Sequence, residues 1–276
     1  MRYEVKFYYS GKLDDMVLAI GKNRSRIVAY LAVFIALVTV FDVIPMVPGF
    51  YGGIWDSWIF LLAPLIGVLL GPLYGLIVVG LGSFLGHIIY FRDPFELLFL
   101  LGAVLGTACA ALIFQRRWKP VLLIYTILLV GYFLYPVSWT LPIVGIWDVL
   151  LAYVLVVLFS ILITRNWWPT TPWTDLWVLL LFAAIIGLEA DVLFRIFLLV
   201  PGQTYWLFYG FTPEALYWIW LTAGIITPMK VALGTLFTVT IGYSLLRLLP
   251  RTEIPLTENY GPLKTHLPTK EMNEKT

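Results

Sequence analysis

Long apolar runs alternate with short polar stretches along most of the chain. An α-helix needs about 20 mainly apolar residues to cross the hydrocarbon core of a bilayer, and eight runs come close to that length. They predict membrane-spanning helices at 27–46, 54–71, 72–91, 94–114, 121–136, 143–164, 174–200 and 228–249. We therefore expect an all-α, polytopic helical bundle with a single transmembrane domain at 27–249.

The last apolar region is longer than one span requires. It begins near Glu214, and a straight helix over the 36 residues 214–249 would be about 54 Å long. Because proline removes a backbone donor and disrupts helices, Pro228 predicts a break. We expect a helix at 214–226 on or dipping into the outer face, with the span proper beginning at Pro228.

Lysine and arginine residues predict the orientation, because cytoplasmic loops retain them. They gather before the first span, after the fourth and sixth spans, and after the eighth. Both termini are thus expected to be cytoplasmic, as an N-terminal segment at 1–26 and a tail at 250–276. Residues 1–26 lack the apolar core of a cleaved signal, so the first span is expected to insert the chain into the cell membrane.

The predicted outer loops are rich in aromatic residues and glycine, as in VPGFYGGIWDSW at 47–58 and PGQTYWLFYGFTPEALYW at 201–218. Tyrosine and tryptophan also form the ordinary interfacial belt of membrane proteins. Two interpretations remain open: a plain belt, or an aromatic cap over a binding site.

Composition narrows the class of protein. The residues are 61% hydrophobic and 12% charged, well outside the soluble average, and a net charge of +2 does not favour nucleic acid. One cysteine excludes an internal disulfide. The two histidines form no metal-binding motif, so neither a metal nor a cofactor is expected.

Ionisable residues inside spans cost about 2.5–3.5 kcal/mol each, so they tend to face a cavity or a partner. Here they gather in the outer halves of the predicted spans, which predicts a pocket that opens outward and closes toward the cytoplasm. The residues concerned are Asp42, Asp56, His87, Glu96, Asp148, Glu189, Asp191, Arg195 and Lys230. Asp42 and Asp148 have an alternative role as hydrated groups near the lipid headgroups, and His87 as a hydrogen-bonded packing residue.

The segment GLEADVLFR at 187–195 combines three of these charges. Asp191 and Arg195 are four residues apart with the acid first, which is the favourable order for an ion pair on one helical face. Glu189 projects about 200° around the helix from Asp191 and has no such partner. Its predicted partners are Lys230, His87 or a ligand.

Small residues recur at intervals of four, which allows close helix contacts in lipid. They are Gly67, Gly71 and Gly75, Gly82 and Gly86, Gly102 and Gly106, and Ala32 and Ala36. The Gly71–Pro72 step also predicts a very short hairpin between the second and third spans.

Together these features resemble the substrate-binding S component of energy-coupling factor (ECF) vitamin transporters. The matching parts are the basic N-terminus, the AxxxA step, the long first outer loop, LIGVLLGPLYGLIVVGLGSFLG at 65–86 and TPMKVALGTLFTVTIGYSLLRLL at 227–249. The resemblance covers roughly 20–115 and 174–250. The family core has six helices, so 121–165 is interpreted as an inserted helical hairpin.

The resemblance implies a division of labour. Ala32 and Ala36 would contact a transmembrane coupling subunit, which joins this chain to partner ATPases, since the chain has no GxxxxGK[ST] motif and is not expected to be an enzyme. The ligand would be a small organic micronutrient, a vitamin or precursor, stacked on aromatic rings such as Tyr205 or Trp206, with an anionic group at Lys230 or Arg195. The expected substrate-binding residues are Trp55, Asp56, Trp58, His87, Glu189, Arg195 and Lys230.

Three other functions remain open. An intramembrane lipid-modifying enzyme would use Glu189, Asp191 and His87 as acid–base groups. A stand-alone secondary transporter predicts two related halves with broken helices, and no convincing repeat is found. A structural assembly subunit explains the glycine pattern but gives no purpose to the polar residues.

Overall fold

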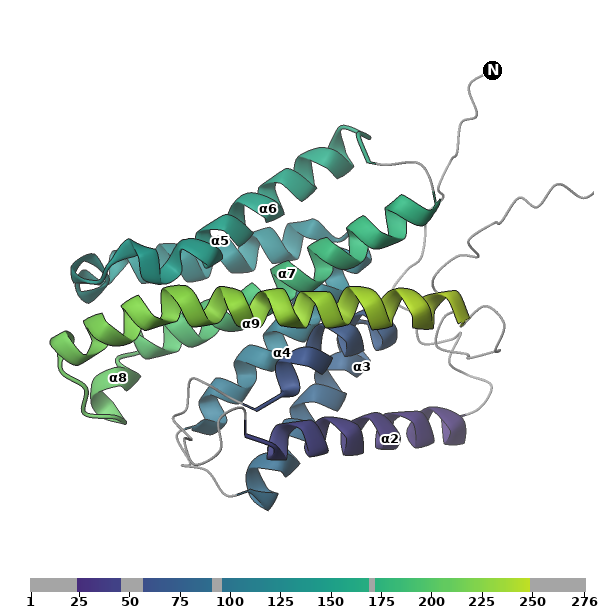
Figure 1. Cartoon of the computed structure of the whole chain (residues 1–276), viewed down its shortest axis with the longest axis horizontal. Helices are drawn as coiled ribbons and strands as arrows, with labels where there is room; N and C mark the ends of the chain where they lie inside the picture. The colour runs from purple at the N-terminus through teal and green to yellow at the C-terminus, as the bar shows by residue number, and fades with distance from the viewer. Residues whose placement is uncertain (1–23, 46–56, 91–95, 169–171, 249–276) are drawn as a thin grey trace, which may run out of the picture.

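The computed structural model describes residues 24–45, 57–90, 96–168 and 172–248, and within these ranges it contains helices and no β-strand. The helices form an elongated bundle whose members run mostly along its length (Figure 1). Their bounds are α2 (Arg24–Val43), α3 (Ile59–Ile89), α4 (Glu96–Phe114), α5 (Trp118–Leu134), η2 (Pro136–Thr140), η3 (Ile143–Ile146), α6 (Trp147–Thr164), α7 (Pro172–Leu199), α8 (Thr204–Leu207) and α9 (Pro213–Leu248).

Five helical segments are long and apolar enough to cross a membrane: Ile59–Ile89, Glu96–Phe114, Ile143–Thr164, Asp175–Leu199 and Pro213–Leu246. Two shorter apolar helices, Ile27–Val43 and Trp118–Leu134, accompany them. The chain is thus an all-α, multi-pass membrane protein.

Helix α3 is two limbs joined at Gly71, as the Gly71–Pro72 step predicts. Gly71 has φ 76° and ψ 177°, a conformation that residues with a Cβ rarely adopt. A Cβ built on Gly75 would lie 3.3 Å from the Cα of Gly67, whereas eight residues of straight helix span about 12 Å. The chain therefore folds back on itself here. The first limb, 59–70, is about 18 Å long, shorter than the hydrocarbon core.

The predicted break at Pro228 is wrong, because α9 continues from Pro213 to Leu248. Proline cannot donate to the carbonyl four residues earlier, which here belongs to Gly224. That carbonyl instead accepts a hydrogen bond of 2.8 Å from the indole Nε1 of Trp147, at the start of α6. A side chain from another helix thus takes the place of the missing backbone donor.

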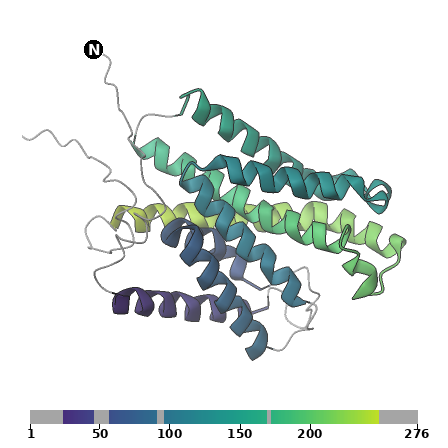
Figure 2. The same ribbon diagram turned by 180° about the vertical axis from the view of Figure 1, so that it is seen from behind.

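Helix α7 is the centre of the bundle, since it packs against α3, α4, α5, α6 and α9. Helix α2 packs on α3, at the edge of the bundle away from the pair formed by α5 and α6 (Figures 1 and 2). The largest group of buried apolar residues lies where α4, α5, α6 and α7 meet. The N-terminal end of α2 and the C-terminal end of α9 lie at the same end of the bundle (Figure 1).

The predicted small-residue contacts hold the inner helices together. Gly106 of α4 and Gly187 of α7 face each other: a Cβ on Gly106 would lie 2.5 Å from the carbonyl oxygen of Gly187. Gly82 and Gly86 of α3 lie in the same way against Val38 and Asp42 of α2. These helices approach as closely as their backbones allow.

We expect Gly106→Ala to lower the free energy of unfolding by about 1–3 kcal/mol, because the added methyl group meets backbone that cannot move aside. Gly80→Ala is the matched control. Its Cβ would lie 3.6 Å from Val104, an ordinary contact, so this variant should be neutral or slightly stabilised. Unfolding in mixed micelles measures both, and equal stabilities would contradict the packing described.

Candidate functional site

A pocket lies between η3, the C-terminal part of α7 and the N-terminal half of α9. Its empty volume, including the open mouth, is about 570 Å³. The lining residues are Gly145, Val192, Arg195, Ile196, Leu199, Ile219, Trp220, Ala223, Thr227 and Lys230. The three polar ones come from two helices, while Gly145 belongs to the connection between α5 and α6.

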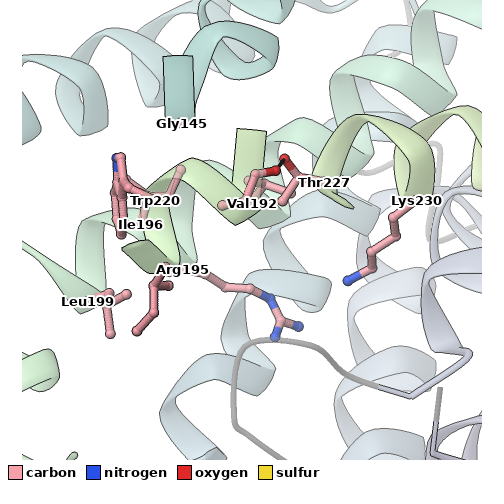
Figure 3. Close-up of a pocket in the computed structure, with 10 residues that line it drawn as sticks. Gly145, Val192, Arg195, Ile196, Leu199, Trp220, Thr227 and Lys230 are labelled. Atoms are coloured by element: carbon pink, nitrogen blue, oxygen red, sulfur yellow. Dashed lines mark hydrogen bonds between the residues drawn. The ribbon is translucent and has the colours of Figure 1, made fainter. Parts of the chain in front are cut away.

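The pocket has an apolar end and a charged end. Trp220 and Leu199 lie together at one end, while Arg195 and Lys230 extend toward each other at the other (Figure 3). The Nζ atom of Lys230 also lies 5.3 Å from the ring centroid of Phe60 on α3, within cation–π range. A ligand with a flat apolar body and one polar end would match this arrangement.

Arg195 is paired with Asp191, as their spacing predicts. The guanidinium Nε donates to Asp191 Oδ1 over 2.6 Å, and both side chains are buried. Gly102 of α4 lies directly against this carboxylate, so a larger residue there would displace the pair. Asp191 therefore neutralises the charge of Arg195.

Asp148 connects α6 to the pocket. Its Oδ2 accepts a short hydrogen bond from the hydroxyl of Thr227, and its Oδ1 accepts one of 2.9 Å from the backbone N–H of Val149. Asp148 is 4% exposed, which argues against the hydrated role considered for it. A carboxylate thus lies directly behind the wall of the pocket.

Glu189 is on α7, about one turn before Val192, the first residue of this helix that lines the pocket. It is seven residues before Ile196 and three before Val192, which places it about 20° and 60° around the helix from these lining residues. The side chain is buried, and its Oε2 has no hydrogen-bond partner among the described residues. Lys230, Asp148 and Asp191 are the charged groups that act on it. The predicted partnership with Lys230 is thus electrostatic.

His87 belongs to a different group, which joins α2 to α3. Its Nδ1 lies 3.1 Å from Asp42 Oδ2 and 2.8 Å from the carbonyl oxygen of Ser83, and the hydroxyl of Ser57 donates to Asp42 Oδ1 over 2.9 Å. His87 does not line the pocket. This geometry favours the hydrogen-bonded packing role.

The aromatic residues proposed for stacking are dispersed. Trp58 packs on Phe60, with ring centroids 5.9 Å apart, and Tyr205 is buried in the same hydrophobic cluster as Trp220. Trp206 is exposed. Trp55 and Asp56 lie outside the described residues. None of the described ones lines the pocket, where Trp220 supplies the indole ring instead.

The lining residues of α9 could have been found from the sequence. Trp220, Ala223, Thr227 and Lys230 follow one another at intervals of three or four residues, the spacing of one helical face. The predicted break at Pro228 assigned these residues to two separate helices, so their common face was not recognised. Gly145 carries no comparable signal, because it comes from a short turn between helices.

Comparison with known proteins finds no match to this chain among family models, curated proteins or solved structures. The resemblance to S components therefore rests on the sequence features alone.

We expect Arg195→Met to lower the free energy of unfolding by about 3–5 kcal/mol, because it leaves the buried Asp191 carboxylate without its cation. The double variant Asp191→Asn, Arg195→Met removes both charges and should recover most of that loss. Unfolding in mixed micelles tests the comparison. A double variant as unstable as Arg195→Met would show that the pair does not act as a unit.

Proposed function

We propose that this chain is the substrate-binding subunit of an ECF-type importer in the cell membrane, and that it captures a small organic micronutrient from the outer face. The observation that carries this proposal is the pocket between α7 and α9, which has an indole ring at one end and two cationic side chains at the other. A pocket with an apolar wall and a few converging polar groups is typical of small-molecule sites.

The proposal includes an orientation in which the pocket end of the bundle faces outward and both termini are cytoplasmic. It also treats the two limbs of α3 as separate spans, giving eight with α2, α4, α5, α6, α7 and α9. Substrate would then enter near Leu199, the last residue of α7. The charged groups would meet it within the outer half of the membrane, where their burial strengthens electrostatic recognition.

The exposed face of α2 supports a coupling partner. Ala32 and Ala36 are both exposed, together with Val33 and Leu37, while Val38 on the other side is fully buried. Small residues on an exposed helical face allow a second helix to approach closely in lipid. This face is proposed to bind the transmembrane coupling subunit, through which partner ATPases supply energy.

The enzyme alternative gains no support from the geometry. The three groups that would supply acid–base chemistry are engaged separately: Asp191 with Arg195, and His87 with Asp42 on another pair of helices. Of these three groups, Glu189 is the one that is not engaged in such a pair. A binding role accounts for this arrangement without a reaction.

The chain purified alone in detergent from cells grown in rich medium should retain a small organic molecule, which mass spectrometry of the extracted protein will identify. Lys230→Met should reduce the retained amount at least about tenfold, the loss expected for one charge-assisted hydrogen bond. Lys119→Met, at an exposed position on α5, is the control and should retain as much as the parent chain. Repeated absence of any retained molecule would contradict the proposal.

The double variant Ala32→Leu, Ala36→Leu should lose co-purification with the coexpressed coupling subunit, because bulky side chains prevent close approach, while ligand retention stays unchanged. Ala232→Leu, an exposed alanine on α9, serves as control and should assemble normally. If the double variant lost ligand retention while assembly survived, the assignment of this face would be wrong.

A further inference from the structure

Two exposed arginines lie on the connections that follow α4 and α6. Arg117 immediately precedes α5 and Arg165 immediately follows α6, and neither has a carboxylate partner among the described residues. The sequence contains no acidic residue at 97–147 or 149–174. Asp175, at the start of α7, is already paired with a different arginine. Positive charge is therefore concentrated on this surface without a counter-charge from the described part of the chain.

The two connections are held together by a small polar group. The Nη2 atom of Arg116 donates to both oxygens of Asp175, over 2.7 Å and 2.9 Å, and the indole Nε1 of Trp168 donates to the same carboxylate. The guanidinium of Arg116 also lies 5.4 Å from the ring centroid of Trp168. Arg117 adjoins Arg116, and Arg165 is three residues before Trp168. Both exposed arginines thus belong to one end of the bundle.

The backbone of both connections is internally satisfied. The N–H groups at 115–117 and 165–167 all donate to carbonyl oxygens of the helix that precedes them, over 2.8–3.3 Å. Each turn contains one residue in the left-handed conformation, Arg116 with φ 60° and Asn166 with φ 54°, as in the turns that commonly end helices. The arginine side chains are consequently the donors that these turns offer to a ligand.

An exposed apolar row extends along each helix from this charged end. Helices α5 and α6 lie side by side (Figures 1 and 2). The exposed residues of each recur at intervals of three or four, which places them on one helical face, and Arg165 continues the row of α6 after four further residues. The rows are Leu123, Ile127 and Val130 on α5, and Val154, Leu158 and Ile161 on α6.

Two tryptophans accompany the arginines. Trp118 follows Arg117 directly, and Trp167, which is 70% exposed, is two residues after Arg165. Tryptophan is enriched where a membrane protein meets the lipid headgroups. The Nζ atom of Lys119 lies 5.8 Å from the ring centroid of Trp118, within cation–π range, so this charge is engaged by the ring. The two arginines are thus the cations available at the level of the headgroups.

We infer that this end of the bundle binds a phospholipid with a negatively charged headgroup, whose phosphate contacts Arg117 and Arg165 and whose acyl chains lie along the exposed rows of α5 and α6. Guanidinium groups bind phosphate through paired donors, and basic groups between membrane helices are suited to anionic headgroups. The pocket uses the C-terminal part of α7, whereas this surface adjoins its start. The inference therefore goes beyond the proposed function and does not depend on it.

Native mass spectrometry of the purified full chain in non-ionic detergent can test this inference. Phosphatidylglycerol, which is anionic, and phosphatidylcholine, which is neutral overall, are added in equal amounts with identical acyl chains. We expect complexes with phosphatidylglycerol to be at least about tenfold more abundant, because two cations act on its headgroup. An excess of inorganic phosphate should not displace the bound lipid, since it lacks the acyl chains that contact α5 and α6.

The double variant Arg117→Gln, Arg165→Gln should bind the two lipids within about twofold of each other. Arg117→Lys, Arg165→Lys is the matched control: it keeps both charges and should retain most of the preference. Equal binding of both lipids to the unmodified chain, an unchanged preference in the glutamine variant, loss of the preference in the lysine variant, or displacement of the lipid by inorganic phosphate would each overturn the inference. The comparison of lipids in the unmodified chain decides the matter even if a variant does not fold.

Discussion

Within an apolar bundle, every polar group must find its partner inside the protein, because lipid offers none. This constraint explains most contacts between the helices. The Asp148–Thr227 hydrogen bond joins α6 to α9, and the group of Asp42, His87 and Ser57 joins α2 to α3. Several buried polar atoms of the described residues lack a hydrogen-bond partner, and Glu189 Oε2 is the one among them that belongs to a carboxylate. The pocket lies beside the place where the internal pairing is incomplete.

Hydrophobic run length was sufficient to find the helices, because a bilayer sets a minimum length for each. Glycine spacing identified Gly106 as part of a close-contact face, since only small residues permit such an approach, but its partner Gly187 came from the structure. The fate of Pro228 could not be predicted. Whether a proline breaks a helix depends on a donor from elsewhere, and the donor, Trp147, is 81 positions earlier in the chain.

The site was predictable only in part, because some of its contacts lie within one helix and others depend on how separate helices pack. The Asp191–Arg195 pair lies within one helix, so its spacing was enough. The convergence of Lys230 with Arg195 depends on how α7 and α9 pack, and the separation of His87 depends on its contact with Asp42. The depth in the membrane that we predict from the sequence is similar for all these residues, so it does not separate them. The position of each residue around its helix decides whether it lies at the pocket, as Arg195 and Lys230 do, or at the contact between α2 and α3, as His87 does.

The hydrogen bond between Trp147 and the Gly224 carbonyl affects the order in which Trp147 and Pro228 can be substituted without loss of stability. Replacing Pro228 first is harmless to that carbonyl, because a new backbone N–H becomes available to it. Replacing Trp147 first leaves a bare carbonyl beside a proline in a nonpolar setting. A substitution of Trp147 should therefore be tolerated only after Pro228 has been replaced.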